Sequence, residues 1–230
     1  MRIHHARLDD CAAARGAVVV IDVIRAFTTA AHAFAAGARE IVLVAAVEEA
    51  LSLRAQIPGA LLMGEVGGFP PPGFDFGNSP VALNGVDLHD RVLIQRTGAG
   101  TQAAVRCAHA SILLLASFPC AAATVRALRA RTPTELTLVA SGPEGEDAAF
   151  ARHLEALLRD EPPDPAWLEQ ARAAGLRRFA APGIEATTTA AQRDAFRADI
   201  ECCVALDRFD FAIGVTQRDG LLVARRLPAH

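Results

Sequence analysis

VVVIDVIRAFTT, from Val18 to Thr29, is the stretch that decides the fold. It places four apolar residues of high strand propensity directly before Asp22, and Arg25 and an alanine-rich segment follow. A short uninterrupted apolar run is typical of a strand buried on both faces of a parallel sheet. Open sheets of this kind bind ligands at the carboxyl ends of their strands, where Asp22 and Arg25 would lie. Asp22 therefore has two interpretations: it caps the following helix, or it takes part in chemistry.

The same pattern recurs along the chain. Apolar runs predict six strands of this kind, at residues 17–21, 41–44, 61–63, 92–94, 112–115 and 136–139. Helices are predicted between them, as at 28–36 and 47–56, and this alternation indicates a largely parallel sheet with right-handed crossovers. Residues 211–215 and 221–223 predict a closing C-terminal hairpin.

The length of 230 residues suits one large α/β domain over 1–230. A connector, Asp160-Glu161-Pro162-Pro163-Asp164-Pro165, marks the place near 160–165 where a sub-division would fall. Beyond it, residues 166–176 are predicted to form a helix.

The basic residues exclude two classes of enzyme. All 23 basic residues other than histidine are arginine, and the sequence contains neither lysine nor tyrosine. A Schiff-base enzyme needs a lysine amine, and the G-x-x-x-x-G-K-[ST] phosphate loop needs its lysine. An anion must therefore be bound by arginine, by backbone N–H groups or by a metal ion.

Charge and cysteine usage indicate the partners and the compartment. The net charge of −3 predicts no nucleic-acid partner, and no apolar run approaches the length that crosses a membrane. The five cysteines form no C-x-x-C pair and make an odd count, which favours a reducing, cytoplasmic location. A small molecule is the expected partner.

Polar residues collect where predicted strands end. Five junctions, expected at one edge of the sheet, carry Asp22 with Arg25, Glu65, the segment 96–101, Ser117, and Glu146 with Asp147. Each junction alone has an ordinary interpretation as capping or dipole complementation. Together, carboxylates suit Mg²⁺, arginines bind phosphate or sulfonate oxygens, and a helix N-terminus after residue 97 offers amides to an anion.

Two familiar motifs fit less well. Gly98-x-Gly100-x-x-Ala103 matches the dinucleotide fingerprint, but Ser117 and Phe118 stand where its acidic residue should follow. A nicotinamide enzyme is therefore a weaker alternative. Phosphatases with a D-x-D-x-T motif are excluded, because the position two after Asp22 is Ile24.

Several blocks, in order, resemble the 2-phosphosulfolactate phosphatase family: IDVIRAFTT, GE followed by GG, GFDFGNSP, a T-G-x-G-T turn, ASFPCAAA and EGEDAAFA. The resemblance spans residues 18–147. It implies a three-layer α/β/α fold, here with a largely parallel sheet and a C-terminal hairpin. It also implies a Mg²⁺-dependent phosphoric monoester hydrolase, commonly a homodimer, that converts 2-phosphosulfolactate to sulfolactate in coenzyme M biosynthesis.

The resemblance, together with the polar ends of the predicted strands, predicts roles for individual residues. The expected catalytic residues are Asp22, Arg25, Glu65 and Arg96. The expected substrate-binding residues are Thr28, Thr29, Asn78, Ser79, Thr97, Gly98, Gly100, Thr101, Ser117 and Phe118. The expected metal ligands are Asp22, Asp75, Glu146 and Asp147. Arg25 and Arg96 would hold the phosphate and a second anionic group, and Asp22 is either nucleophile or metal ligand.

Two blocks depart from the family pattern. The fourth block usually reads T-T-N-G-T, whereas residues 96–101 read R-T-G-A-G-T here, and Cys120 stands where asparagine is expected. Both departures are predicted to touch substrate contacts. A non-catalytic small-anion binding protein on the same fold is therefore the alternative function.

Overall fold

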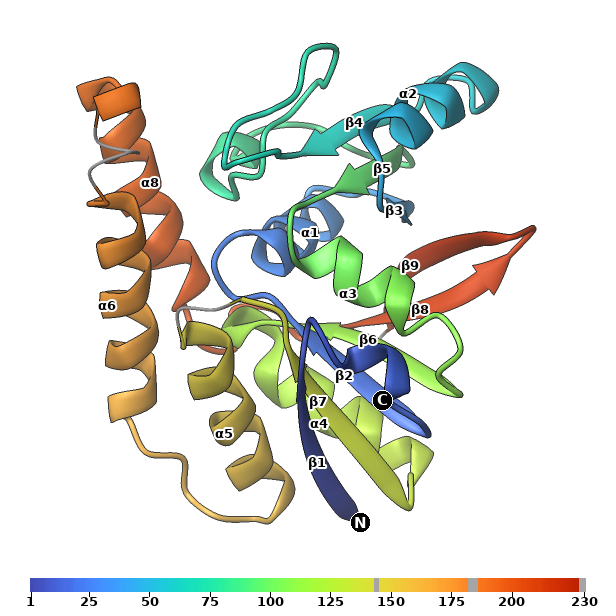
Figure 1. Ribbon diagram of the computed structural model, residues 1–230, viewed down its shortest axis with the longest axis vertical. Helices are drawn as coiled ribbons and strands as arrows, with labels where there is room; N and C mark the ends of the chain where they lie inside the picture. The colour runs from blue at the N-terminus through green and yellow to red at the C-terminus, as the bar shows by residue number, and fades with distance from the viewer. Residues whose placement is uncertain (143–144, 182–185, 228–230) are drawn as a thin grey trace.

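A computed structural model describes residues 1–142, 145–181 and 186–227, and within them nine strands form one sheet (Figure 1). The strands in chain order are β1 (Arg2–Arg7), β2 (Ala17–Ile21), β3 (Glu40–Val44), β4 (Leu61–Gly64), β5 (Val92–Arg96), β6 (Ile112–Ala116), β7 (Glu135–Ala140), β8 (Ala212–Arg218) and β9 (Leu221–Leu227). Across the sheet their order is β1-β7-β2-β6-β8-β9-β3-β5-β4.

The sheet consists of two parallel halves joined by an antiparallel hairpin. The strands β1, β7, β2 and β6 are parallel to one another, as are β3, β5 and β4. The hairpin β8–β9 lies between the halves, with β8 antiparallel to β6 and β9 antiparallel to β3. The predicted parallel sheet and C-terminal hairpin are confirmed, and the hairpin lies at the centre of the sheet.

Helices cover both faces of the sheet, which confirms the three-layer fold. Their bounds are α1 (Ala26–Ala35), α2 (Val47–Gln56), α3 (Gly100–Arg106), α4 (Ala121–Arg131), α5 (Glu146–Leu158), α6 (Ala166–Phe179) and α8 (Ala190–Cys203), with single 3₁₀ turns η1 (Cys11–Ala13), η2 (Val81–Leu83) and η3 (Phe118–Cys120). Side chains alternate along β2: Val18 and Val20 join the core under α1 and α3, whereas Val19 and Ile21 join the core under α4 and α5. Helix α2 covers the β3–β5–β4 half on the face opposite α1 and α3.

Three local predictions need correction. Strand β1 was not predicted, because its sequence RIHHAR is polar and mostly exposed at the sheet edge, where pairing with β7 forms it. The pattern of Ser79-Pro80, an N-cap followed by proline at the first helical position, predicts a helix start, but it leads only into the 3₁₀ turn η2. The helix predicted at 166–176 continues to Phe179.

Helices α6 and α8 lie side by side, outside the layers over the sheet, at the left of Figure 1. They pack closely at Gly175, where an added Cβ would meet Ile24 Cδ1 at 3.0 Å and Ile200 Cγ1 at 3.1 Å. Through this contact with Ile24, the helix pair packs against the turn that follows β2. Among the described helices, none combines the length and the apolar character that crossing a lipid bilayer demands.

Candidate active site

A cavity of about 310 Å³ lies at the carboxyl ends of the parallel strands from both halves of the sheet. Its charged lining consists of four carboxylates and two guanidinium groups, from Asp22, Glu65, Glu146, Asp147, Arg25 and Arg178. Five of these six were predicted from the ends of strands. Charge therefore converges on one edge of the sheet, as the sequence predicted.

Asp22 directly follows β2 and is 8% exposed. One of its carboxylate oxygens accepts a hydrogen bond from the amide of Ala26 at the long distance of 3.4 Å, a weak form of the predicted cap. Burial raises the pKa of Asp22 to about 7; Arg178 opposes this rise, and the carboxylates of Glu146 and Glu65 add to it. Asp22 thus holds a charge that its surroundings satisfy poorly.

Asp147 lies in the first turn of α5 and ties two loops together. Its Oδ1 accepts from the amide of Val23 at 2.8 Å, and its Oδ2 accepts from the amide of Gly142 at 2.6 Å and the hydroxyl of Ser141 at 3.2 Å. Burial, followed by the charge of Asp22, raises the pKa of Asp147 to about 7. Asp147 therefore fixes the turn after β2 while adding negative charge beside Asp22.

Glu65 follows β4 and connects the other half of the site. Its Oε2 accepts from the amide of Gly68 at 2.7 Å, and its Oε1 accepts from the amide of Gly98. The backbone carbonyl of Glu65 accepts from Arg96 Nη1 at 2.8 Å. The carboxylate thus joins the glycine-rich loop after β4 to the turn between β5 and α3.

Arg25 is buried and held from several directions. Its φ of 90° is unusual for a residue with a side chain, and such strain is typical of functional sites. Its Nη2 donates to the carbonyl of Gly68 at 3.2 Å, and its guanidinium lies 5.0 Å from the ring centroids of both Phe179 and Phe196. Burial lowers the pKa of Arg25, and the charge of Asp199 opposes that change. These contacts fix the direction of the guanidinium.

The turn from Thr97 to Thr101 is closed by its own hydroxyls. The amide of Thr97 donates to Thr101 Oγ1 at 2.8 Å, and the amide of Thr101 donates to Thr97 Oγ1 at 3.1 Å. Gly100 lies against Asp22, since an added Cβ would be 2.7 Å from Asp22 Oδ2. Gly98 and Ala99 line the cavity, whereas the two threonine side chains stabilise the turn.

Several predicted residues lie outside the cavity lining. Asp75 accepts from Arg54 Nη2 at 3.2 Å and from the amide of Leu62 at 2.8 Å, so the structure does not bring this expected metal ligand to the other carboxylates. Arg96 donates Nε to the carbonyl of Ala45 at 3.1 Å and Nη1 to that of Glu65. Arg96 therefore supports the loops that carry the site.

The remaining expected substrate-binding residues divide into two groups. The first group has structural contacts. The Thr28 hydroxyl donates to the carbonyl of Val23 at 3.0 Å, and the Ser79 hydroxyl donates to Asp199 Oδ1 at 2.6 Å. The Phe118 ring lies 4.8 Å from the Phe150 ring, centroid to centroid. The other group, Asn78, Thr29 and Ser117, has buried side-chain oxygens that find no hydrogen-bond partner in the described part of the chain. Of that group only Asn78 lines the cavity.

Sequence reasoning missed Arg178 in α6, and Ser141 and Gly142 after β7. It also missed Asp199, which is fully buried in α8 and accepts from Ser79 and from the amide of Val81. The short Ser-Gly pair after an apolar run was the available signal for Ser141 and Gly142. Arg178 gave none, because three arginines occur in α6 and the packing of the helix decides which one faces the cavity.

The donor set bears on a metal ion. The carboxylate and backbone oxygens around Asp22 are the hard ligands that Mg²⁺ prefers. In residues 1–142, 145–181 and 186–227, no three His, Cys, Asp or Glu side chains form a cluster able to hold a metal by themselves. A magnesium ion would thus be coordinated by one or two carboxylates together with substrate and water oxygens, as is common for Mg²⁺ in proteins.

Fold and site together define an α/β protein with a charged cavity, lined by carboxylates and arginines, at the carboxyl edge of a largely parallel sheet. The family model described as 2-phosphosulpholactate phosphatase matches residues 3–218, and the chain belongs to this family. The resemblance read from the sequence blocks is confirmed.

Individual relatives agree with the family. A protein of Bacillus subtilis (strain 168), named probable 2-phosphosulfolactate phosphatase, is 38% identical over 143 residues, which are 61% of this chain and 63% of the relative. One of the same name from Deinococcus radiodurans is 41% identical over 128 residues, 55% of this chain and 53% of the relative. The chain thus spans between half and two thirds of these relatives. A third, from Prochlorococcus marinus (strain MIT 9313), is 33% identical over 224 residues, 90% of this chain and 92% of the relative.

Proposed function

We propose that the chain is a Mg²⁺-dependent phosphatase that hydrolyses the phosphomonoester of a small 2-hydroxy acid with a further anionic group, 2-phosphosulfolactate being the candidate substrate. The observation that carries the proposal is Asp22, a buried and poorly satisfied carboxylate facing a cavity that also holds Arg25 and Arg178. The names of the relatives support the same reaction and substrate.

The charge of the cavity supports a divalent cation. Its lining has four carboxylates against two guanidinium groups, so fully ionised side chains leave an excess of two negative charges. A phosphate dianion would be repelled from that lining unless protons or a cation compensate. We therefore propose that Mg²⁺ binds with Asp22 as its main protein ligand and with Glu146 and Asp147 in its surroundings, whereas Asp75 is left out because it lies outside the cavity.

The chain's own residues would then position the substrate. Arg25, which lies beside the stacked rings of Phe179 and Phe196, presents a fixed guanidinium to the phosphate, whose oxygens suit its planar fork. Glu65 links the loop after β4 to the turn before α3 through its two hydrogen bonds and so fixes the distance between them. Gly98 and Ala99 of that turn then form one wall of the cavity. When bound, Mg²⁺ supplies charge stabilisation on the phosphoryl group and a more acidic water.

The test is release of inorganic phosphate from 2-phosphosulfolactate by the purified full chain. We expect release with Mg²⁺, loss of release with EDTA, and recovery when excess Mg²⁺ is added. Release that is unchanged by EDTA would remove the metal from the proposal, and no release from a broad panel of phosphoesters would reject hydrolysis. Borohydride reduction of quenched enzyme distinguishes the two roles of Asp22, because an aspartyl-phosphate would be reduced to homoserine.

The binding-only alternative retains one observation in its favour. Ala99 belongs to the block that departs from the family pattern, and it lines the cavity. The second departure, Cys120, does not support this alternative, because Cys120 is buried in the core and lies outside the cavity lining. Binding of 2-phosphosulfolactate without phosphate release would favour this alternative.

The nicotinamide alternative is weaker on geometry. In the dinucleotide fingerprint the second glycine lets the backbone approach a pyrophosphate. Here Gly100 faces the carboxylate of Asp22 instead, and a pyrophosphate beside it would meet like charge. The homodimer and the role in coenzyme M biosynthesis stay proposals from the family resemblance, and the cytoplasmic location stays one from cysteine usage. Sedimentation of the purified chain tests the homodimer.

A further inference from the structure

We propose that Arg178 binds the second anionic group of the substrate and so determines the preference for substrates that carry one. The proposal rests on the phosphatase function proposed above and adds a specificity residue to it. The sequence predicted that Arg25 and Arg96 would hold the two anionic groups. However, Nε and Nη1 of Arg96 both donate to backbone carbonyls, and Arg96 does not line the cavity. Among the described lining residues, Arg25 and Arg178 are the two arginines.

The packing of α6 aims Arg178 at the cavity. Gly175 brings α6 against Ile24, which lies between Asp22 and Arg25 in the chain. Residues three and four positions apart share one face of a helix, so Arg178 and Phe179 lie one turn beyond this contact on the side of the site. Phe179 reaches the guanidinium of Arg25, and Arg178 lines the cavity itself.

The two arginines differ in how far they are exposed to solvent. Arg25 is 4% exposed and lies beside the stacked rings of Phe179 and Phe196. The side chain of Arg178 is 35% exposed, and its Nη1 lies 3.8 Å from Glu146 Oε1. A buried cation suits the phosphate, which every substrate shares, and a cation nearer to solvent suits the group that varies between substrates, a carboxylate or sulfonate.

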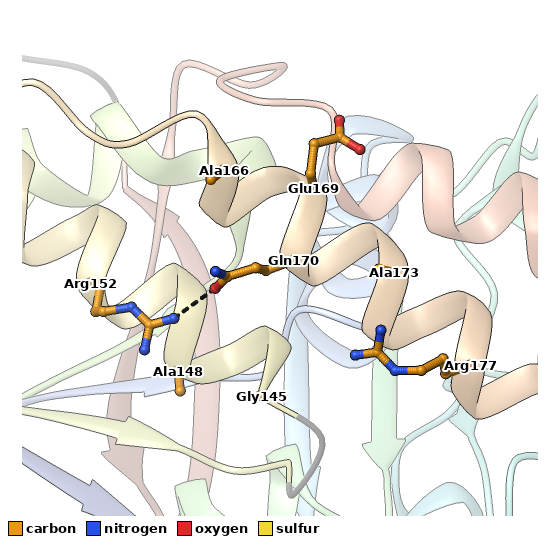
Figure 2. Close-up of a pocket in the computed structure, with 8 residues that line it drawn as sticks. All are labelled: Gly145, Ala148, Arg152, Ala166, Glu169, Gln170, Ala173 and Arg177. Atoms are coloured by element: carbon orange, nitrogen blue, oxygen red, sulfur yellow. Dashed lines mark hydrogen bonds between the residues drawn. The ribbon is translucent and has the colours of Figure 1, made fainter.

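The neighbouring Arg177 provides a matched control. It is exposed and lines a different, open groove between α5 and α6, together with Arg152 and Gln170 (Figure 2). Arg152 Nη2 donates to Gln170 Oε1 across this groove at 2.9 Å. Arg177 and Arg178 thus share a helix, a charge and an adjacent position, but only Arg178 reaches the cavity.

The experiment compares two substrates that differ by one charge. In isopropyl phosphate a methyl group replaces the carboxylate of 2-phospholactate. For Arg178→Gln we expect kcat/KM to fall about 10- to 100-fold with 2-phospholactate, the usual cost of a lost charge-assisted hydrogen bond, and at most about threefold with isopropyl phosphate. Arg178→Lys, which keeps the charge without the fork, should recover part of the loss, and Arg177→Gln should change neither substrate by more than about twofold.

Several results would overturn the proposal. They are an equal loss with both substrates, no loss with either, or the same change of preference in Arg177→Gln. If Arg178→Gln does not fold, Arg178→Lys decides, and an unchanged substrate preference in that variant rejects the proposal.

If the wild-type chain releases no phosphate, calorimetric binding replaces kinetics and separates the two proposals. Tighter binding of 2-phospholactate than of isopropyl phosphate, lost in Arg178→Gln, would support Arg178 although hydrolysis had failed. Equal binding of the two compounds by the wild type, or no binding of either, would reject the role of Arg178.

Discussion

Two carboxylates on opposite sides of the cavity, Asp22 and Glu65, are buried equally but differ in the hydrogen bonds that satisfy them. Asp22, on the side built by β2 and β7, and Glu65, on the side built by β4 and β5, are each 8% exposed. Glu65 accepts hydrogen bonds from two backbone amides, those of Gly68 and Gly98, whereas Asp22 accepts one at 3.4 Å. Burial alone therefore does not identify the reactive group.

The difference assigns separate tasks to the two carboxylates. A carboxylate whose lone pairs are used by amides is part of the framework. A buried carboxylate with spare lone pairs is available to a metal ion or a substrate, and burial raises the pKa of Asp22 to about 7. We accordingly expect mutations on the two sides to separate activity from stability.

The largest effect is expected for Asp22→Asn. Loss of this charge should lower the rate of phosphate release by on the order of 10³-fold or more. The melting temperature should rise, by about 2 °C or more, because a buried and poorly satisfied charge is removed. Phosphate assay and differential scanning calorimetry measure the two changes; a lower melting temperature would show that Asp22 is structural.

Glu65→Gln should show the reverse pattern. The Glu65 carboxylate accepts hydrogen bonds from two backbone N–H groups. In the glutamine variant the NH₂ group would face one of these donors, so a buried N–H group would lose its acceptor. The free energy of unfolding should fall by about 1–3 kcal/mol, measured by chemical denaturation. A variant of unchanged stability that has lost all activity would instead place Glu65 among the reacting groups.

A pH titration of stability should separate the sides further. The pKa values of Asp22 and Asp147 are raised from 3.8 to about 7, so these carboxyls bind more protons in the folded than in the unfolded chain between these limits. Their contribution is complete below about pH 4 and is lost as pH rises through about 7. In metal-free buffer, the melting temperature of Asp22→Asn relative to wild type should therefore climb from pH 4 to 8; a constant difference would contradict the raised pKa.

The smallest effect is expected for Asp75→Asn. The ion pair with Arg54 is partly exposed, so its loss should cost about 1 kcal/mol or less. The Mg²⁺ concentration for half-maximal activity should not change, because Asp75 lies outside the cavity lining. A tenfold rise of that concentration would return Asp75 to the metal site.

Sequence reasoning was most successful where one segment determines its own environment. The apolar run before Asp22 predicts a strand buried on both faces, and the end of that strand is a sheet edge wherever its neighbours lie. The position of the hairpin β8–β9 at the centre of the sheet could not be predicted, because partner choice depends on contacts distant in sequence. Strand β1 was missed for the same reason, since only its pairing with β7 makes RIHHAR a strand.

The candidate site shows the same limit at the level of side chains. Arg96 ends β5 and Asp75 lies in the loop after β4. The Arg96 side chain turns to backbone carbonyls, and the Asp75 side chain turns to an amide and to Arg54. Arg178 enters from a helix whose orientation is set by the close contact at Gly175. Position along the chain located the edge of the site, and packing selected the groups that face into it.

The position of the single tryptophan has a spectroscopic consequence. Trp167 is the one indole in a sequence without tyrosine, and it lies on α6, the helix that carries Arg178. Its ring is 6.0 Å from the guanidinium carbon of Arg152 and 6.5 Å from the ring of His153, both on α5. Ultraviolet emission of the unlabelled protein therefore originates at the contact between these two helices and reports a change in their packing directly.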